Sequence, residues 1–229
     1  SPFGNAQVVA NVGGSMGDMY GLGFVRSPDG DIVYKDGMPQ IDPNPVYLGN
    51  SIPKFKTSLG SQFNYRNLSL NVLFDAQFGA VGHAFSIARS AENGKSALTL
   101  PGRYNGIIGN GVVQNADGSF RPNDVIATDV PAYYKATYYD NAEGSMFSTD
   151  FVKFREASLT YTLPTRIVQK MRLSKVSIGG FGRNLFIWSP WPVFDPEFGS
   201  LAGTDIVTGF EVGQLPSTRT YGFRLVVGI

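Results

Sequence analysis

The chain has 229 residues, of which only 16% are charged, against about 25% in soluble domains, while Gly, Tyr and Phe are plentiful. This composition favours strands and turns over helices. The net charge of +1 argues against a nucleic-acid partner, and the lack of cysteine excludes disulfides, thiolate metal sites and cysteine catalysis. No run of about 18 apolar residues occurs, so the sequence predicts no transmembrane helix.

Segments in which apolar and polar residues alternate predict long β-strands. Five such segments cover about residues 55–65, 68–78, 150–163, 175–188 and 218–229, and 16–26 is a possible sixth. The clearest is 68–78. Its even positions are all apolar, from Leu68 to Phe78, and most of its odd positions are polar, as at Asn71 and Asp75.

The linkers between these segments are of two kinds. Arg66 and Asn67 alone separate two strands and predict a tight hairpin, and 164–174 is a second short linker with room for one helical turn. The linkers 81–149 and 189–217 are long and rich in Gly, Pro, Asn and Asp. All short linkers therefore fall at one end of the sheet, as in bacterial outer-membrane barrels, where short turns are periplasmic and long loops are extracellular.

The lengths of the strands favour an all-β, antiparallel transmembrane β-barrel over a soluble β-sandwich. The predicted strands exceed the usual length of about five or six residues. Aromatic residues such as Phe55, Tyr65 and Tyr161 lie near strand ends, as in the aromatic girdles of barrels. A secreted carbohydrate-binding β-sandwich remains the alternative. Because the smallest membrane barrels have about eight strands, we expect the missing strands to come from outside this chain.

Five stretches of the sequence resemble the C-terminal end of the SusC/RagA-type TonB-dependent transporters of Bacteroidetes. In chain order they are 47–55 (YLGNSIPKF), 73–79 (LFDAQFG), 150–164 (DFVKFREASLTYTLP), 182–186 (GRNLF) followed by 195–197 (DPE), and 216–223 (PSTRTYGF). Their order is that of the family, and the resemblance runs from about residue 16 to the C-terminus.

This resemblance implies that residues 1–229 are the last part of a 22-stranded barrel in the bacterial outer membrane. The plug domain and the N-terminal strands would then lie outside this chain, with TonB acting through that absent region. The family imports oligosaccharides or oligopeptides, and a SusD-like surface lipoprotein caps the barrel. The expected partners are therefore the rest of the same transporter, the lipoprotein, TonB, lipid and the cargo.

No catalytic, cofactor-binding or metal-binding residue is expected, and we predict a protein without enzymatic activity. A β-rich glycan hydrolase would need a carboxylate pair, and no spacing in the sequence supports one. His83, the only histidine, is interpreted as an ordinary loop residue. The possible contacts to cargo or lid are aromatic residues of the two long linkers, with packing inside an ordered loop as the alternative for the tyrosines; they are Tyr133, Tyr134, Tyr138, Tyr139 and Trp191.

Overall fold

The structure is a computed structural model that describes residues 5–198 and 208–229. It divides into two compact units. Unit 1 comprises residues 1–53, 79–148 and 197–214, and unit 2 comprises 54–78, 149–196 and 215–229. Among the described residues, no helix is both long and apolar enough to cross a membrane.

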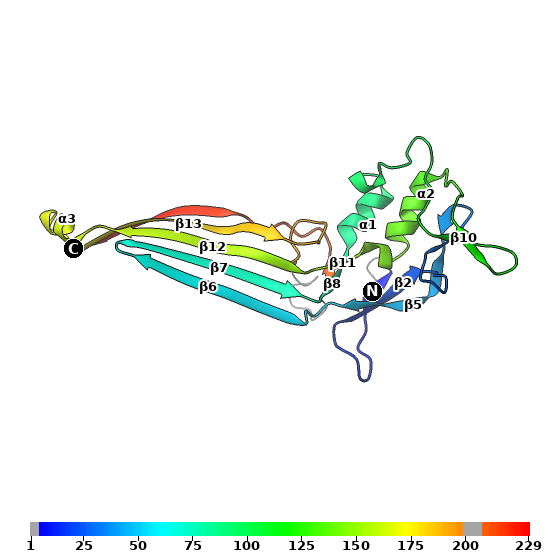
Figure 1. Ribbon diagram of the computed structural model, residues 1–229, viewed down its shortest axis with the longest axis horizontal. Coiled ribbons are helices and arrows are strands. Elements are labelled where there is room, and N and C mark those ends of the chain that lie inside the picture. The colour runs from blue at the N-terminus through cyan, green and yellow to red at the C-terminus, as the bar shows by residue number, and fades with distance from the viewer. Residues whose placement is uncertain (1–4, 199–207) are drawn as a thin grey trace. The chain divides into compact units, whose positions relative to one another are not determined.

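Unit 2 is built on one antiparallel sheet of five long strands, in the order β15-β13-β12-β7-β6 (Figure 1). The strands are β6 (Phe55–Tyr65), β7 (Leu68–Phe78), β12 (Phe151–Thr162), β13 (Lys175–Trp188) and β15 (Thr220–Gly228). The short helix α3 (Thr165–Lys170) follows β12. The five main predicted strands are thus confirmed, as is the helical turn after 163.

The hairpin between β6 and β7 has the predicted two-residue turn. Arg66 adopts a left-handed backbone conformation (φ 53°), which such tight turns require. Asn67 then ties the turn to the next strand, because its side-chain amide donates to the carbonyl of Thr162 over 2.6 Å. The turn therefore sets the register in which β7 pairs with β12.

The sheet of unit 2 does not close into a barrel. Within the described part of the chain, β6 and β15 each pair along one edge only. No second sheet is stacked on this one inside unit 2, so the unit does not have the architecture of a β-sandwich. The possible sixth strand, 16–26, exists as β2 (Asp18–Phe24), but it was wrongly grouped with the other five, because it pairs with β1 and β5 in unit 1.

In its described residues, unit 1 holds three small sheets and several short helices. The first sheet contains β1 (Ala6–Val8), β2 and β5 (Ile41–Asn50); the second contains β3 (Val33–Lys35), β4 (Met38–Pro39), β9 (Val112–Gln114) and β10 (Phe120–Pro122); the third contains β8 (Val81–Ala84), β11 (Met146–Ser148) and β14 (Phe210–Glu211). The helices are α1 (Phe85–Glu92) and α2 (Val130–Tyr134), with 3-10 turns at Ala97–Thr99 and Glu143–Ser145 and a π-helical turn at Lys135–Tyr139.

The linker 81–149, expected to be one of the long extracellular loops, contains short strands and helices and forms much of unit 1. Two clusters of buried residues are found in the part of the unit that the structure describes, and they hold it together. One is centred on Tyr34, Val130 and Tyr133, and the other contains Met19 and Phe210. The linker 81–149 thus folds, together with residues 5–53, into an ordered body with its own core.

Candidate functional site

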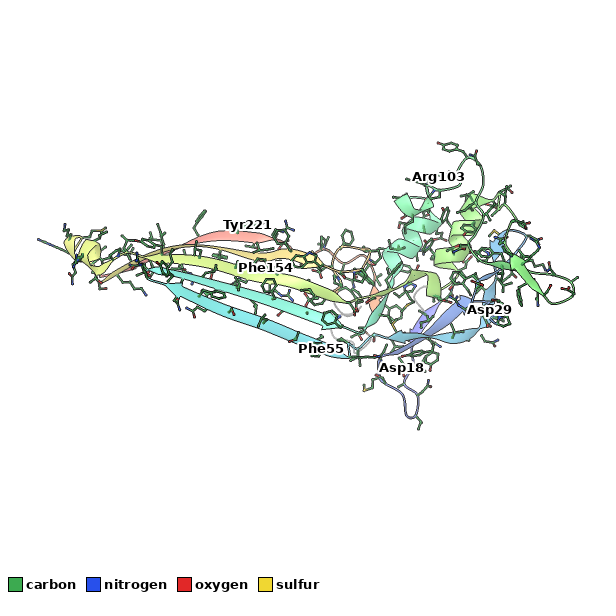
Figure 2. The ribbon with its side chains drawn as sticks, viewed as in Figure 1. Asp18, Asp29, Phe55, Arg103, Phe154 and Tyr221 are labelled. Atoms are coloured by element: carbon green, nitrogen blue, oxygen red, sulfur yellow. The ribbon has the colours of Figure 1, made fainter. Side chains whose placement is uncertain are left out.

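The sheet of unit 2 has one apolar face whose side chains form rows across the strands. Leu59 lies opposite Phe74, and Phe74 lies opposite Phe154. The rings of Phe74 and Phe154 stack with centroids 4.6 Å apart. Phe186 continues the same row on β13. Figure 2 shows Phe154 and Tyr221 on their strands of this sheet.

This apolar face is exposed. The side chain of Leu159 is 50% exposed and that of Phe223 is 97% exposed, and neither lies in a packed core. Other members of the face with large exposed fractions are Phe55, Leu59, Phe63, Tyr65, Tyr161, Ile178, Tyr221 and Leu225. A continuous apolar surface of this kind is rare on soluble monomers and marks a contact with membrane or protein.

The opposite face of the same sheet is polar and connected by hydrogen bonds. Asp75 pairs with Arg155 over 2.7 Å and accepts a hydrogen bond of 2.6 Å from the hydroxyl of Ser58. Nearer the hairpin, Asn71 donates to the hydroxyl of Ser158 over 3.3 Å. The two faces therefore differ in chemistry as the inner and outer faces of a membrane barrel do.

A β-bulge in β12 keeps the two faces separate. Opposite β7, Phe154 pairs with Phe74 and Glu156 pairs with the next residue, Leu73, so Arg155 is the additional residue of β12. Opposite β13 the additional residue lies in β13, between Arg183 and Phe186. The shift places Phe154 and Ala157 on the same face although three positions separate them, since they lie opposite Phe74 and Val72. A strict period of two through this strand would have placed Phe154 on the polar face.

A buried ion pair anchors the long linker 189–217 to β12. The ammonium of Lys153 lies 2.6 Å from Oδ1 of Asp195. Ser217 donates its hydroxyl hydrogen to the other oxygen of the same carboxylate. Residues near both ends of the linker are thus held at one point of the strand.

Trp191, a predicted cargo or lid contact, lies in the same linker and is buried. Its backbone N–H donates to the hydroxyl of Ser189 over 3.1 Å, and that hydroxyl donates to the carbonyl of Asp150 over 2.6 Å. These bonds fix the chain next to the start of β12. The indole therefore has little surface free for a ligand.

Three of the predicted tyrosines pack together in unit 1. Tyr133 and Tyr134 are buried and meet edge to face, with centroids 5.4 Å apart. Tyr34 stacks on Tyr133 at 6.5 Å, and Tyr138 stacks on Tyr134 at 6.4 Å. Burial raises the pKa of Tyr133, Tyr134 and Tyr138, so these phenols stay protonated. The cluster serves as a core for the linker.

Tyr139 is partly exposed, like Tyr138, and its ring lies beneath a cation. The guanidinium of Arg89, on α1, is 4.7 Å from the centre of the Tyr139 ring. Arg89 also pairs with Glu92 over 2.7 Å. Tyr138 and Tyr139 are the predicted tyrosines that keep some accessible surface.

A pocket that the sequence did not indicate lies beside Tyr134. It has a volume of about 500 Å³ and is lined by Ala91 and Glu92 of α1, by Val130 and Tyr134 of α2, and by the segment between the helices. That segment carries Arg103, labelled in Figure 2. No motif in residues 92–104 predicts such a site.

Arg103 is held in place by the backbone of its own segment. Its Nε donates to the carbonyl of Thr99 over 2.8 Å, and its Nη2 donates to the Thr99 hydroxyl over 2.7 Å and to the carbonyl of Gly94 over 2.5 Å. Among the described residues, its Nη1 has no hydrogen-bond acceptor. The pocket thus offers one fixed cation beside a largely apolar wall.

His83 does not lie in a loop, contrary to its interpretation above. It is fully buried in β8, between the rings of Phe85 and Phe210. Neither ring nitrogen has a hydrogen-bond partner among the described residues, and burial lowers the pKa of His83 to about 4. No group of three or more His, Cys, Asp or Glu side chains that could hold a metal occurs in the described ranges.

The fold is similar to that of three solved structures. The RagAB peptide importer in its closed-closed state has a chain that is 15% identical over 96% of this chain, with a TM-score of 0.59. The open-open state gives 14% identity over 98% and a TM-score of 0.60, and a structure of the RagAB peptide transporter gives 14% over 96% and 0.57.

The similarity covers only part of the solved chains. This chain spans 24–25% of their length. No protein-family description and no curated protein matches the sequence. At this identity the comparison shows the fold: an antiparallel, all-β arrangement shared with a segment of these RagAB chains.

Proposed function

We propose that this chain is the C-terminal barrel portion of a SusC/RagA-type, TonB-dependent transporter in a bacterial outer membrane. It has no catalytic role and forms wall and rim in the import of oligopeptides or oligosaccharides. The single observation that carries this proposal is the sheet of unit 2, whose long strands present an exposed apolar face on one side and a polar, ion-paired face on the other.

The open edges of that sheet support the need for further strands. An unpaired strand edge is unstable in hydrocarbon, because each unsatisfied backbone group costs several kcal/mol. In the proposed protein, the edges of β6 and β15 are covered by strands of the same transporter that lie outside this chain. A plug domain and the TonB-contacting segment also belong to that missing part.

Unit 1 forms the extracellular rim in this proposal. The long linkers that build it leave the end of the sheet opposite the two-residue hairpin. We place a surface lipoprotein lid and the cargo on this rim, as the RagAB pairing suggests. Tyr138 and Tyr139 are the better candidates for contact, whereas Tyr133, Tyr134 and Trp191 act through the packing they provide.

The pocket beside Tyr134 adds a candidate subsite for cargo. A fixed guanidinium next to apolar walls suits a peptide, whose carboxylate would pair with Arg103 while an apolar side chain packs on Val130. The peptide importer among the similar structures favours oligopeptides over oligosaccharides as the cargo.

The proposal is tested by placing a charge on either face of β6 in the full-length protein. Leu59 lies on the apolar face near the middle of the strand and its neighbour Gly60 points to the other face, where an added Cβ meets no atom closer than 3.7 Å. Leu59→Arg should destabilise the folded barrel by about 2–4 kcal/mol and so reduce the folded fraction in heat-modifiability assays. Gly60→Arg is the matched control and should fold normally; equal tolerance of both would contradict the proposal.

A further inference from the structure

The end of the unit 2 sheet that carries the short turns is strongly basic. The hairpin, the turn around α3 and the start of β13 meet there, because Asn67 pairs with Thr162 and the N–H of Leu163 donates to the carbonyl of Val176 over 2.9 Å (Figure 1). Five exposed cations share this end: Arg66, Arg166, Lys170, Arg172 and Lys175. We call this set the basic end.

No carboxylate side chain of unit 2 neutralises the basic end. The acidic residues of the unit are Asp75, Asp150, Glu156 and Asp195. Asp75 and Glu156 lie on their strands several residues from the turns, and Asp150 and Asp195 lie outside the strands, before β12 and after β13, at the other end of the sheet. None of the five cations takes part in an ion pair among the described residues. The charge is therefore available to an external anion.

An apolar groove begins next to the basic end, on the exposed apolar face. It has a volume of about 660 Å³. Leu159 and Tyr161 of β12 form one wall, Phe223 and Leu225 of β15 form the other, and Ile178 and Gly180 of β13 form the floor. Gly180 leaves the floor open, because a Cβ there would meet nothing nearer than the Gly222 carbonyl oxygen at 3.9 Å.

The groove and the cations are within the reach of one lipid molecule. Tyr161 lies opposite Leu68, only two residues from Arg66. Ile178 follows Lys175 by three residues on the same strand, which corresponds to about 10 Å. A lipid with an acyl chain in the groove would thus have its headgroup at the level of the exposed guanidinium and ammonium groups.

We infer that the basic end and this groove together bind a phospholipid with an anionic headgroup. The inference rests on the proposed function, which turns the apolar face to lipid and the short turns to the periplasm. The phosphate and any further negative charge of the headgroup pair with the basic end. One acyl chain fills the space above Gly180 between Leu159 and Phe223.

The test uses the full-length protein, reconstituted into vesicles of mixed phosphatidylglycerol and phosphatidylcholine. Native mass spectrometry then identifies the lipids that the extracted protein retains. The variant Arg166→Gln, Lys170→Gln, Arg172→Gln should lose phosphatidylglycerol retention by about tenfold or more. The matched control, Lys54→Gln, Lys56→Gln, Arg219→Gln, removes three exposed cations from the opposite end of the sheet and should retain it.

A second variant, Gly180→Leu, fills the groove and leaves every cation in place. It should also reduce phosphatidylglycerol retention, while excess inorganic phosphate should not displace the lipid from the unaltered protein. Equal retention by all variants, or no preference over phosphatidylcholine, would overturn the inference. If the unaltered protein does not insert into vesicles at all, the proposed membrane function itself fails, so the two failures are distinguishable.

Discussion

The ammonium of Lys153 and the carboxylate of Asp195 form a buried ion pair of 2.6 Å, with only 3% and 11% of the two side chains exposed. The pair joins the linker 189–217 to a buried position near the start of β12. A buried charge that loses its partner is strongly destabilising, by about 3–5 kcal/mol, whereas an exposed pair contributes about 0–1 kcal/mol.

Asp195→Asn should therefore release the linker 189–217 from β12, because Lys153 keeps its charge without the full countercharge. We expect faster cleavage of this linker in limited proteolysis and a lower unfolding temperature of the full-length protein. The control is Glu156→Gln, which breaks the more exposed pair with Arg183 at 2.9 Å and should have little effect. A similar response from both variants would show that the buried pair has no special role.

His83 should make unit 1 sensitive to acid. Because burial lowers the pKa of His83 to about 4, the folded state takes up a proton less readily than the unfolded state, whose histidine titrates near 6.5. Stability is then constant above about pH 6.5 and falls as the pH drops toward 4, by up to about 3 kcal/mol. Hydrogen exchange of β8 between pH 7 and 4 measures this loss.

The nearby Glu211 is buried and accepts hydrogen bonds from Ser86 and from the N–H of Gly213, so the variant that tests His83 leaves Glu211 and these bonds in place. His83→Leu removes two ring nitrogens that have no partner among the described residues, and it should be neutral or stabilising at pH 7. The acid sensitivity between pH 6.5 and 4 should decrease in this variant. An unchanged pH profile would assign the effect to a group other than His83.

Tyr134 should contribute to unit 1 through its hydroxyl as well as its ring. The hydroxyl donates to the carbonyl of Pro101 over 3.0 Å and so closes the segment that carries Arg103. Tyr134→Phe should destabilise unit 1 by about 1 kcal/mol, as judged by hydrogen exchange of α2. Tyr104→Phe is the control, because that side chain is 98% exposed, and protection should remain as in the unaltered protein.

The long strands could be predicted from the sequence because each repeats its period-two pattern many times. The predicted 55–65, 68–78 and 175–188 coincide with β6, β7 and β13. The bulge at Arg155 has only a weak sequence signal: Phe154 and Ala157 are both apolar but stand an odd number of positions apart. Within a single strand, a one-residue shift changes the period-two pattern too little to be detected from the sequence.

Most of unit 1 could not be predicted, because most of its strands are only two to four residues long, too short to show a period, and depend on partners distant in sequence. His83 pairs with Phe210 in a parallel bridge, and Val33 pairs with Val112. The sequence shows the tyrosines of 133–139 as a cluster, yet whether a ring is buried or exposed depends on contacts with residues distant in sequence, such as Tyr34. The pocket at Arg103 forms between α1 and α2 and has no local sequence signal.

The central claim, that one face of the unit 2 sheet contacts lipid, is tested most directly by spin labels along β12. The chain has no cysteine, so single cysteines from 151 to 161 can be introduced here and labelled in the reconstituted full-length protein, once any cysteines in its remaining sequence have been replaced. We predict that labels at Phe154, Ala157, Leu159 and Tyr161 collide with oxygen and that those at Ser158 and Thr160 do not, with the alternation shifting phase at Arg155. Labels at Leu159 and Ser158 with equal access to aqueous reagents, or an alternation of the opposite sense, would contradict the account.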